Sequence, residues 1–119
     1  MRDFREFKVW EKAHGLTLDI YKATATFPRA EMYGLTSQLR RASSSIPANI
    51  AEGCGRGGNA EFGRFLQIGM GSASELEYRI LLAHDLIFLP ELVYDPLQNR
   101  VVEVKRMLTA LHSKVRADR

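Results

Sequence analysis

Six basic residues have side chains suited to holding phosphate groups. They are Arg40, Arg41, Arg56, Arg64, Lys105 and Arg106. Arginine presents a planar fork of donors that matches phosphate oxygens, and a net charge of +3 at pH 7 suits an acidic partner such as nucleic acid. The alternatives are ion pairs with Glu31, Glu52 or Glu61 and the ordinary preference for cations near a helix C-terminus. We expect Arg40, Arg41, Arg56 and Arg64 to form a patch around one end of the fold.

The run 53–58, Gly-Cys-Gly-Arg-Gly-Gly, matches the dinucleotide-binding pattern G-x-G-x-x-G by letter. That motif needs a strand before it and a helix after it, and only the helix is predicted here. We therefore interpret the run as a turn between two helices. A second interpretation stays open, in which the glycine amides, Arg56 and the start of the next helix hold a backbone phosphate of a nucleic acid.

No set of residues predicts catalysis. Glu11 and His14 form one Glu-x-x-His pair, whereas di-iron bundles use two such pairs and two further glutamates. His84 and His112 lie singly in other segments, and Cys54 has no resolving cysteine or histidine base near it in sequence. We expect a protein that is not an enzyme and uses no metal or cofactor.

Composition places the chain among small globular proteins. It has 119 residues, 45% of them hydrophobic and 26% charged, which suits one folded domain over 1–119. The single cysteine cannot form an internal disulfide, and the N-terminal region lacks the apolar run of a signal peptide. No uncharged stretch reaches the roughly 18 apolar residues that a membrane span needs. These features predict a cytoplasmic protein that does not enter the membrane.

Apolar residues recur at spacings of three and four through four segments, about 7–27, 31–55, 59–88 and 96–116. Asn59 is the expected N-cap of the third segment, and Asp95 with Pro96 predicts the start of the fourth. The short connections imply an all-α, antiparallel, up-down-up-down four-helix bundle.

The second helix contains Pro47, which removes the hydrogen bond to the Ser43 carbonyl and predicts a kink. Hydroxyls of the serines at 43–45 are candidates to satisfy the freed carbonyls. We also expect Asn49 to satisfy a freed backbone group or to make a contact between helices.

More apolar residues are present than one stripe on each helix can hold. The surplus comprises Trp10, Leu18, Tyr21, Phe65, Leu81, Leu82, Phe88 and Leu89. A second apolar face on a small bundle indicates a subunit interface. The alternative is a thick core within one chain.

The second helix also carries a motif. The stretches 33–42, Tyr-Gly-Leu-Thr-Ser-Gln-Leu-Arg-Arg-Ala, and 45–53, Ser-Ile-Pro-Ala-Asn-Ile-Ala-Glu-Gly, resemble the proteins encoded by intervening sequences in bacterial large-subunit ribosomal RNA genes. Segments 7–13, 61–66 and 72–77 fit the same family. The motif residues that we single out are Gly34, Gln38, Ser45, Pro47, Asn49, Glu52 and Gly53.

This resemblance implies a four-helix bundle that assembles as a homopentamer. It also implies kinship with accessory variability proteins of diversity-generating retroelements, which bind nucleic acid and a reverse transcriptase. Our leading hypothesis is a non-catalytic homo-oligomer that binds RNA or DNA through the six basic residues. The alternative is a scaffold for a reverse transcriptase or another enzyme, without direct contact to nucleic acid.

Overall fold

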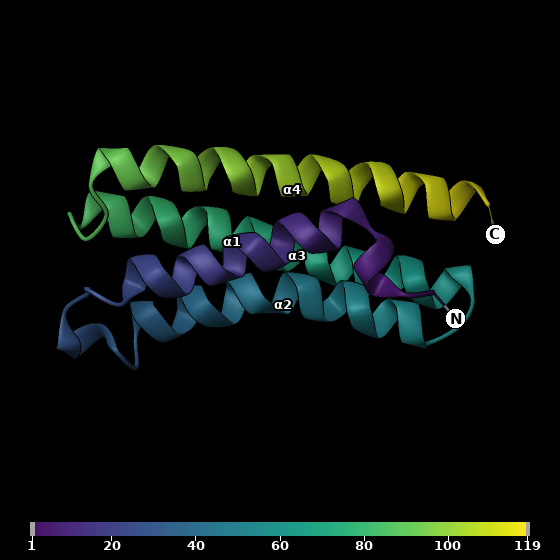
Figure 1. Cartoon of the computed structure of the whole chain (residues 1–119), viewed down its shortest axis with the longest axis horizontal. Helices are drawn as coiled ribbons and strands as arrows, with labels where there is room; N and C mark the ends of the chain where they lie inside the picture. The colour runs from purple at the N-terminus through teal and green to yellow at the C-terminus, as the bar shows by residue number, and fades with distance from the viewer. Residues whose placement is uncertain (1, 119) are drawn as a thin grey trace.

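The computed structural model describes residues 2–118 (Figure 1). This part of the chain contains no strand. It forms two short 3-10 helices, η1 (Phe4–Glu6) and η2 (Arg29–Glu31), and four long helices, α1 (Lys8–Thr24), α2 (Leu35–Gly55), α3 (Asn59–Asp85) and α4 (Glu91–Ala117). The predicted all-α class is confirmed.

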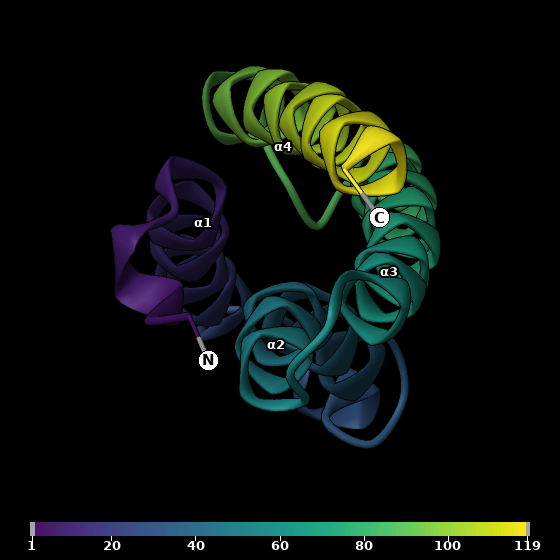
Figure 2. The same ribbon diagram turned by 90° about the vertical axis from the view of Figure 1, so that its right-hand side faces the viewer.

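The four helices form an antiparallel up-down-up-down bundle measuring 45 × 23 × 20 Å. Each long helix packs on its two neighbours in the order α1, α2, α3, α4 and back to α1, and within 2–118 no diagonal pair is in contact (Figure 2). The buried residues of α1, including Val9, Ala13, Leu16 and Ile20, repeat at four and three. That repeat turns one face of each helix to the shared core.

The start of α2 lies four residues later than the predicted residue 31, because Glu31 belongs to η2. The Glu31 carbonyl accepts the N–H of Gly34 at 3.0 Å, and its carboxylate accepts the N–H of Leu35 at 3.2 Å. This carboxylate therefore caps the helix. Gly34 accepts from the N–H of Gln38 at 3.0 Å, which closes the first turn of α2.

Pro47 lies inside α2 and is buried. The carbonyl of Ser43, which loses its helical donor to Pro47, lies 3.0 Å from the hydroxyl of Thr17 on α1, and the Ala13 carbonyl, at 2.9 Å, shares the proton of that hydroxyl. The nearby serines do not serve this carbonyl: Ser43 and Ser44 both donate to the Arg40 carbonyl. The predicted role of the serines is thus taken by α1, and the kink itself stays a prediction.

Asn49 joins a polar contact between α2 and α3. Its amide donates to the Ser45 carbonyl at 2.7 Å and to the Ser45 hydroxyl at 3.0 Å. That hydroxyl is 2.8 Å from the hydroxyl of Ser72 on α3. Both hydrogen bonds of Asn49 lie within α2, and neither reaches the carbonyl that Pro47 frees. The hydrogen bond between the helices is made by Ser45, which Asn49 holds from within α2.

Gly53 is required by the close approach of α3. A Cβ at this position would lie 2.9 Å from Cδ1 of Phe62 and 2.9 Å from Cβ of Phe65. Real Cβ atoms essentially never make contacts this short, so any side chain here would force the two helices apart.

The two ends of α3 differ from prediction. Its N-cap is Gly58, at φ +99°, and Asn59 is the first helical residue. Its last residue is Asp85, where residue 88 was expected. The carbonyls of Ala83 and His84 accept the N–H groups of Phe88 and Ile87, each at 2.9 Å, which is the Schellman arrangement that ends a helix.

The predicted start of the last helix at residues 95 and 96 is wrong. Helix α4 begins at Glu91, and Pro96 lies inside it. The Pro90 carbonyl accepts the N–H groups of Val93 and Tyr94 at 2.9 Å and so forms the first turn. Pro96 is tolerated because the carbonyl it leaves without a donor belongs to Leu92, which is 91% exposed and open to water.

Candidate nucleic-acid interface

Arg40 is held within the bundle. Its Nε donates to the Thr24 hydroxyl at 2.9 Å, its guanidinium donates to the Tyr21 carbonyl at 3.3 Å, and its Cζ lies 4.7 Å from the centre of the Tyr21 ring. These three contacts, two hydrogen bonds and one stacking contact, all reach α1. Arg40 therefore joins α2 to the end of α1.

Arg41 faces the opposite neighbour of α2. Its guanidinium is 2.7 Å from the Glu75 carboxylate of α3, and Arg79 is 3.5 Å from the same carboxylate. Two arginines share one carboxylate at this seam, so the cluster keeps an excess positive charge. Arg41 is itself exposed.

Arg56 and Arg64 lie together at the α2–α3 turn. Arg56 is 2.8 Å from Glu52, Arg64 is 3.0 Å from Glu61, and both guanidinium groups lie within about 5.3 Å of the centre of the Phe65 ring. Both ion pairs are half exposed, and surface pairs of this kind contribute roughly 0–1 kcal/mol. The two arginines are therefore held weakly enough to contact another anion.

The four arginines do not meet at one end of the bundle. Arg40 and Arg41 lie in the second turn of α2, whereas Arg56 follows its last residue. At a rise of about 1.5 Å per residue this separation is roughly 22 Å. Arg56 and Arg64 are thus the only two of the four that the fold brings together.

Lys105 and Arg106 are adjacent on α4 but differ in environment. Lys105 pairs with Glu77 of α3 at 2.8 Å, whereas Arg106 is exposed and pairs with no carboxylate of residues 2–118. Both residues line a groove of about 490 Å³ between α3 and α4, together with Val102 and Thr109. This groove lies along the opposite side of the bundle from the α1–α2 seam that holds Arg40.

The second half of α4 is the most basic part of the structure. Residues 105–116 contain four lysines or arginines and no carboxylate. Lys114 and Arg116, like Arg106, are exposed and form no ion pair with a described carboxylate. Gly63 lies against His112 and Val115, so the end of α4 adjoins the start of α3 that carries Arg64. Lys114 and Arg116 were absent from the predicted set.

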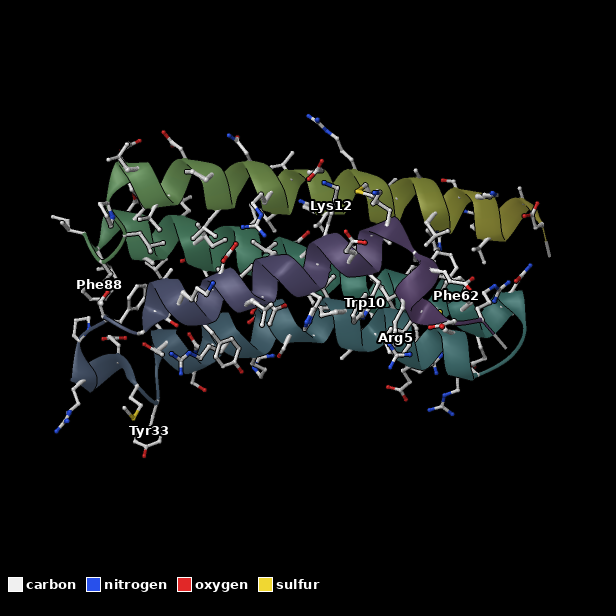
Figure 3. All side chains as sticks on the ribbon, viewed as in Figure 1. Arg5, Trp10, Lys12, Tyr33, Phe62 and Phe88 are labelled. Atoms are coloured by element: carbon white, nitrogen blue, oxygen red, sulfur yellow. The ribbon has the colours of Figure 1, made fainter. Side chains whose placement is uncertain are left out.

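The N-terminal segment covers the α2–α3 turn. The guanidinium of Arg2 hydrogen-bonds the Asn59 side chain and lies 4.6 Å from the centre of the Phe62 ring, and the Phe7 ring lies 5.5 Å from Phe62. Figure 3 places Phe62 at this end and Phe88 at the other. The glycine run is a turn only in part: residues 53–55 end α2, and residues 56–58 form the turn, with Gly57 and Gly58 at φ +68° and +99°.

The other candidate chemical groups have structural partners. Burial raises the pKa of the Cys54 thiol, and the charge of Arg2 partly offsets this effect. His14 stacks on Trp10 at 5.0 Å between ring centres. No cluster of three or more His, Cys, Asp or Glu residues within 2–118 is arranged to hold a metal ion. None of the helices in that range combines the length and hydropathy of a membrane span.

Comparisons with known proteins agree with the motif of α2. The family model of the 23S rRNA-intervening sequence protein matches residues 5–110, and the chain belongs to this family. A similar fold is found in the crystal structure of a protein with unknown function from the S23 ribosomal protein family of Bacteroides thetaiotaomicron. The TM-score is 0.78 at 24% identity, over 87% of this chain and 97% of the other. No curated protein matches the chain.

Proposed function

We propose that the protein is a non-catalytic homo-oligomer, a ring of five subunits, that binds nucleic acid through the basic half of α4 and the arginines beside it. The observation that carries this proposal is the basic run 105–116. Its Arg106, Lys114 and Arg116 are exposed and form no ion pair with a carboxylate of residues 2–118. Five copies together carry a net charge of about +15, and several weak phosphate contacts then act at once.

Assembly is supported by apolar side chains on two opposite helices. Leu18 and Tyr21 on α1 are 50% and 45% exposed, and Tyr78 and Ile68 on α3 are 55% and 42% exposed. Helices α1 and α3 occupy opposite corners of the bundle. Two different apolar faces pointing in opposite directions suit head-to-tail contacts, which close into rings when the rotation allows.

The apolar residues predicted to exceed one stripe on each helix fall into buried, partly buried and exposed groups. Phe65 and Leu89 are buried in the chain, and Trp10, Leu82 and Phe88 pack partly against the core. Leu18, Tyr21 and Leu81 remain exposed. Among these surplus residues, only Leu18, Tyr21 and Leu81 are available to a second subunit.

Gly71 lies on the outer side of α3 between Ile68 and Tyr78. A Cβ there would meet nothing within 4 Å, so the bundle itself does not require a glycine. A glycine inside a helix costs roughly 1 kcal/mol relative to alanine. Close approach of a neighbouring subunit is a reason to keep it.

Of the six predicted residues, Arg56, Arg64 and Arg106 fit a phosphate-binding role best, and Lys114 and Arg116 extend the set. Arg40, Arg41 and Lys105 hold neighbouring helices together through the contacts described above. Arg41 and Lys105 retain a lesser role as flanking charges.

A protein scaffold, for a reverse transcriptase or another enzyme, is the second candidate. It is favoured by the exposed apolar side chains at the α3–α4 turn, at the opposite end of the bundle from Arg56 and Arg64. Co-purification from the native host after nuclease treatment separates the two functions, because only a partner bound by protein contacts survives the nuclease.

The experiment has two readouts. Native mass spectrometry is expected to give a five-subunit mass, and Tyr78→Ser with Leu18→Ser is expected to reduce it to the monomer. Binding to a structured RNA hairpin is expected to weaken as salt rises, because phosphate contacts release counterions. A monomer at micromolar concentration would refute the ring, and salt-independent binding would refute the phosphate contacts.

A further inference from the structure

The α3–α4 turn exposes three large apolar side chains. Leu92 is 91% exposed, Ile87 is 89% exposed and Leu86 is 49% exposed. Phe88 and Leu89 of the same turn point inward, and the Phe88 ring lies 5.5 Å from that of Phe27. The turn is therefore anchored to the core while its outer side chains lie in water. Clustered exposed apolar residues mark interaction sites far more often than scattered ones.

Ile87 occupies a backbone conformation that disfavours its side chain. Its φ is +67°, in the left-handed region, at the position of a helix end where glycine is usual. For a β-branched residue this conformation is a marked outlier, and the side chain gains no burial in return. The position therefore keeps an exposed isoleucine where glycine would suit the turn better.

A groove adjoins Leu92. It has a volume of about 370 Å³ and lies between the end of α1 and the start of α4, with Ala23, Val93 and Pro96 among its apolar lining. Because Pro96 has no N–H, the Leu92 carbonyl keeps a free acceptor beside the groove. The groove can take one large apolar side chain from a partner.

Carboxylates surround this apolar surface. Residues 85–95 contain Asp85, Glu91 and Asp95 and no lysine or arginine. His84 lies 2.9 Å from Glu91 and 3.6 Å from Asp85. The two cations that line the groove, Lys22 and Arg100, both pair with Asp19. A nucleic acid would be repelled here, and a partner that is both apolar and basic would be attracted.

A second copy of the chain fits this chemistry poorly. No large hydrophobic side chain of its basic run 105–116 is exposed. Its exposed Met32 and Tyr33 lie beside Arg40 and Arg41, but Arg40 is already bound to α1 and Arg41 to Glu75. The occupant is therefore a different protein.

We propose that the α3–α4 corner, defined as Leu86, Ile87 and Leu92 with Asp85, Glu91 and Asp95, docks a basic amphipathic helix of a partner protein. One apolar side chain of that helix enters the groove, and its lysines or arginines face the three carboxylates. This site lies at the opposite end of the bundle from Arg56 and Arg64 and does not depend on nucleic-acid binding.

The test uses three synthetic peptides of about 18 residues, added to the full-length, isotope-labelled protein. One is a leucine/lysine amphipathic helix, the second replaces each lysine by glutamate, and the third replaces each leucine by serine. Only the leucine/lysine peptide is expected to bind, with amide shifts concentrated in residues 85–97. Its affinity is expected to fall at least tenfold in Leu92→Ser and at least tenfold in Asp85→Asn with Asp95→Asn.

Tyr33→Ser is the matched control, because it removes an apolar side chain that is as exposed as Leu92 from the connection between α1 and α2, and it should leave the affinity unchanged. Equal binding of the leucine/glutamate peptide would overturn the proposal, as would shifts confined to other regions or an affinity that Leu92→Ser does not alter. Self-association that Leu92→Ser abolishes would also overturn it, by assigning the corner to a second copy. None of these outcomes depends on RNA binding.

Discussion

The two ends of the bundle are built from the same four helices, but they differ in the burial of their apolar side chains and in the sign of the charges around them. At the end that holds the α2–α3 turn, Phe62 and Phe65 are buried, and Arg2 and Phe7 pack on Phe62. At the other end, Leu86, Ile87 and Leu92 are exposed among carboxylates. We call these the closed end and the open end.

The charge of α4 follows the same division. Glu91 and Asp95 lie in its first turns, at the open end, and residues 105–116 carry only positive charge toward the closed end. The helix dipole favours this order, since carboxylates suit the N-terminus and cations the C-terminus. The dipole accounts for the order of the charges, and it leaves the exposure of Ile87 and Leu92 unexplained.

Closure at one end and exposure at the other have different energetic consequences. Substitutions at the closed end should cost folding stability, because side chains there already touch. Substitutions of the exposed apolar side chains at the open end should leave folding unchanged or improve it. The following variants test this difference, in order of decreasing effect.

Gly53→Val should change stability more than any other variant considered. The valine Cβ would overlap Phe62 and Phe65 at 2.9 Å, and we expect a loss of roughly 3 kcal/mol in the free energy of unfolding, measured in urea. Gly55→Val is the control, since a Cβ at that glycine meets nothing within 4 Å. Equal losses in the two variants would contradict the close approach of α3.

Thr17→Val should destabilise the middle of the bundle by about 1–3 kcal/mol, because the Ser43 carbonyl then has no donor. Replacing Pro47 by alanine restores a helical N–H to that carbonyl. In a double-mutant cycle, Thr17→Val should therefore cost less when Pro47→Ala is also present. Strict additivity would show that the threonine does not compensate for the proline.

Ile87→Gly should raise the free energy of unfolding by about 1 kcal/mol, since glycine tolerates the left-handed conformation and the isoleucine side chain that it removes is almost fully exposed. Phe88→Ala, at the next position, should instead lower it, because Phe88 packs on the core. A destabilised Ile87→Gly variant would mean that the isoleucine serves the fold.

Glu91→Gln should have the weakest effect, and one that depends on pH. The hydrogen bond to Glu91 raises the pKa of His84 above its ordinary value of 6.5. This pairing stabilises the fold fully below pH 6.5 and loses its effect as pH rises through the raised pKa. The melting temperatures of wild type and variant should differ at about pH 5.5 and converge by about pH 8.5. A constant difference would rule out the ion pair as the cause.

The regular parts of the fold could be predicted from the sequence. Residues spaced like Val9, Ala13, Leu16 and Ile20 fall on one face only if the segment is a helix. The start of α4 could not, since Asp95 and Pro96 form a stronger local start signal than Pro90. The helix extends N-terminal to Pro96, where Tyr94 packs against the core and stacks on His84. The hydrogen-bond donor to the Ser43 carbonyl could not be predicted from the sequence either, because the packing of α1 on α2 places Thr17 beside it.

The site was predicted less well for a related reason. Charge type is visible in a sequence, but pairing is not: the contacts of Arg40 with Tyr21 and Thr24, and of Lys105 with Glu77, depend on which helices are neighbours. Lys114 and Arg116 become candidates for phosphate binding only once the structure shows that no carboxylate of residues 2–118 pairs with them.

The main proposal is that the basic half of α4 binds nucleic acid. The decisive experiment compares Arg106→Gln/Lys114→Gln/Arg116→Gln with Lys12→Gln/Lys22→Gln/Arg29→Gln, which removes the same charge elsewhere, in binding to one RNA hairpin between about 50 and 200 mM salt. The first variant should bind more weakly and lower the slope of log K against log salt by about 0.9 for each phosphate that it no longer neutralises, while the second should keep most of both. Equal weakening in the two variants would contradict the proposal, because binding would then follow net charge alone.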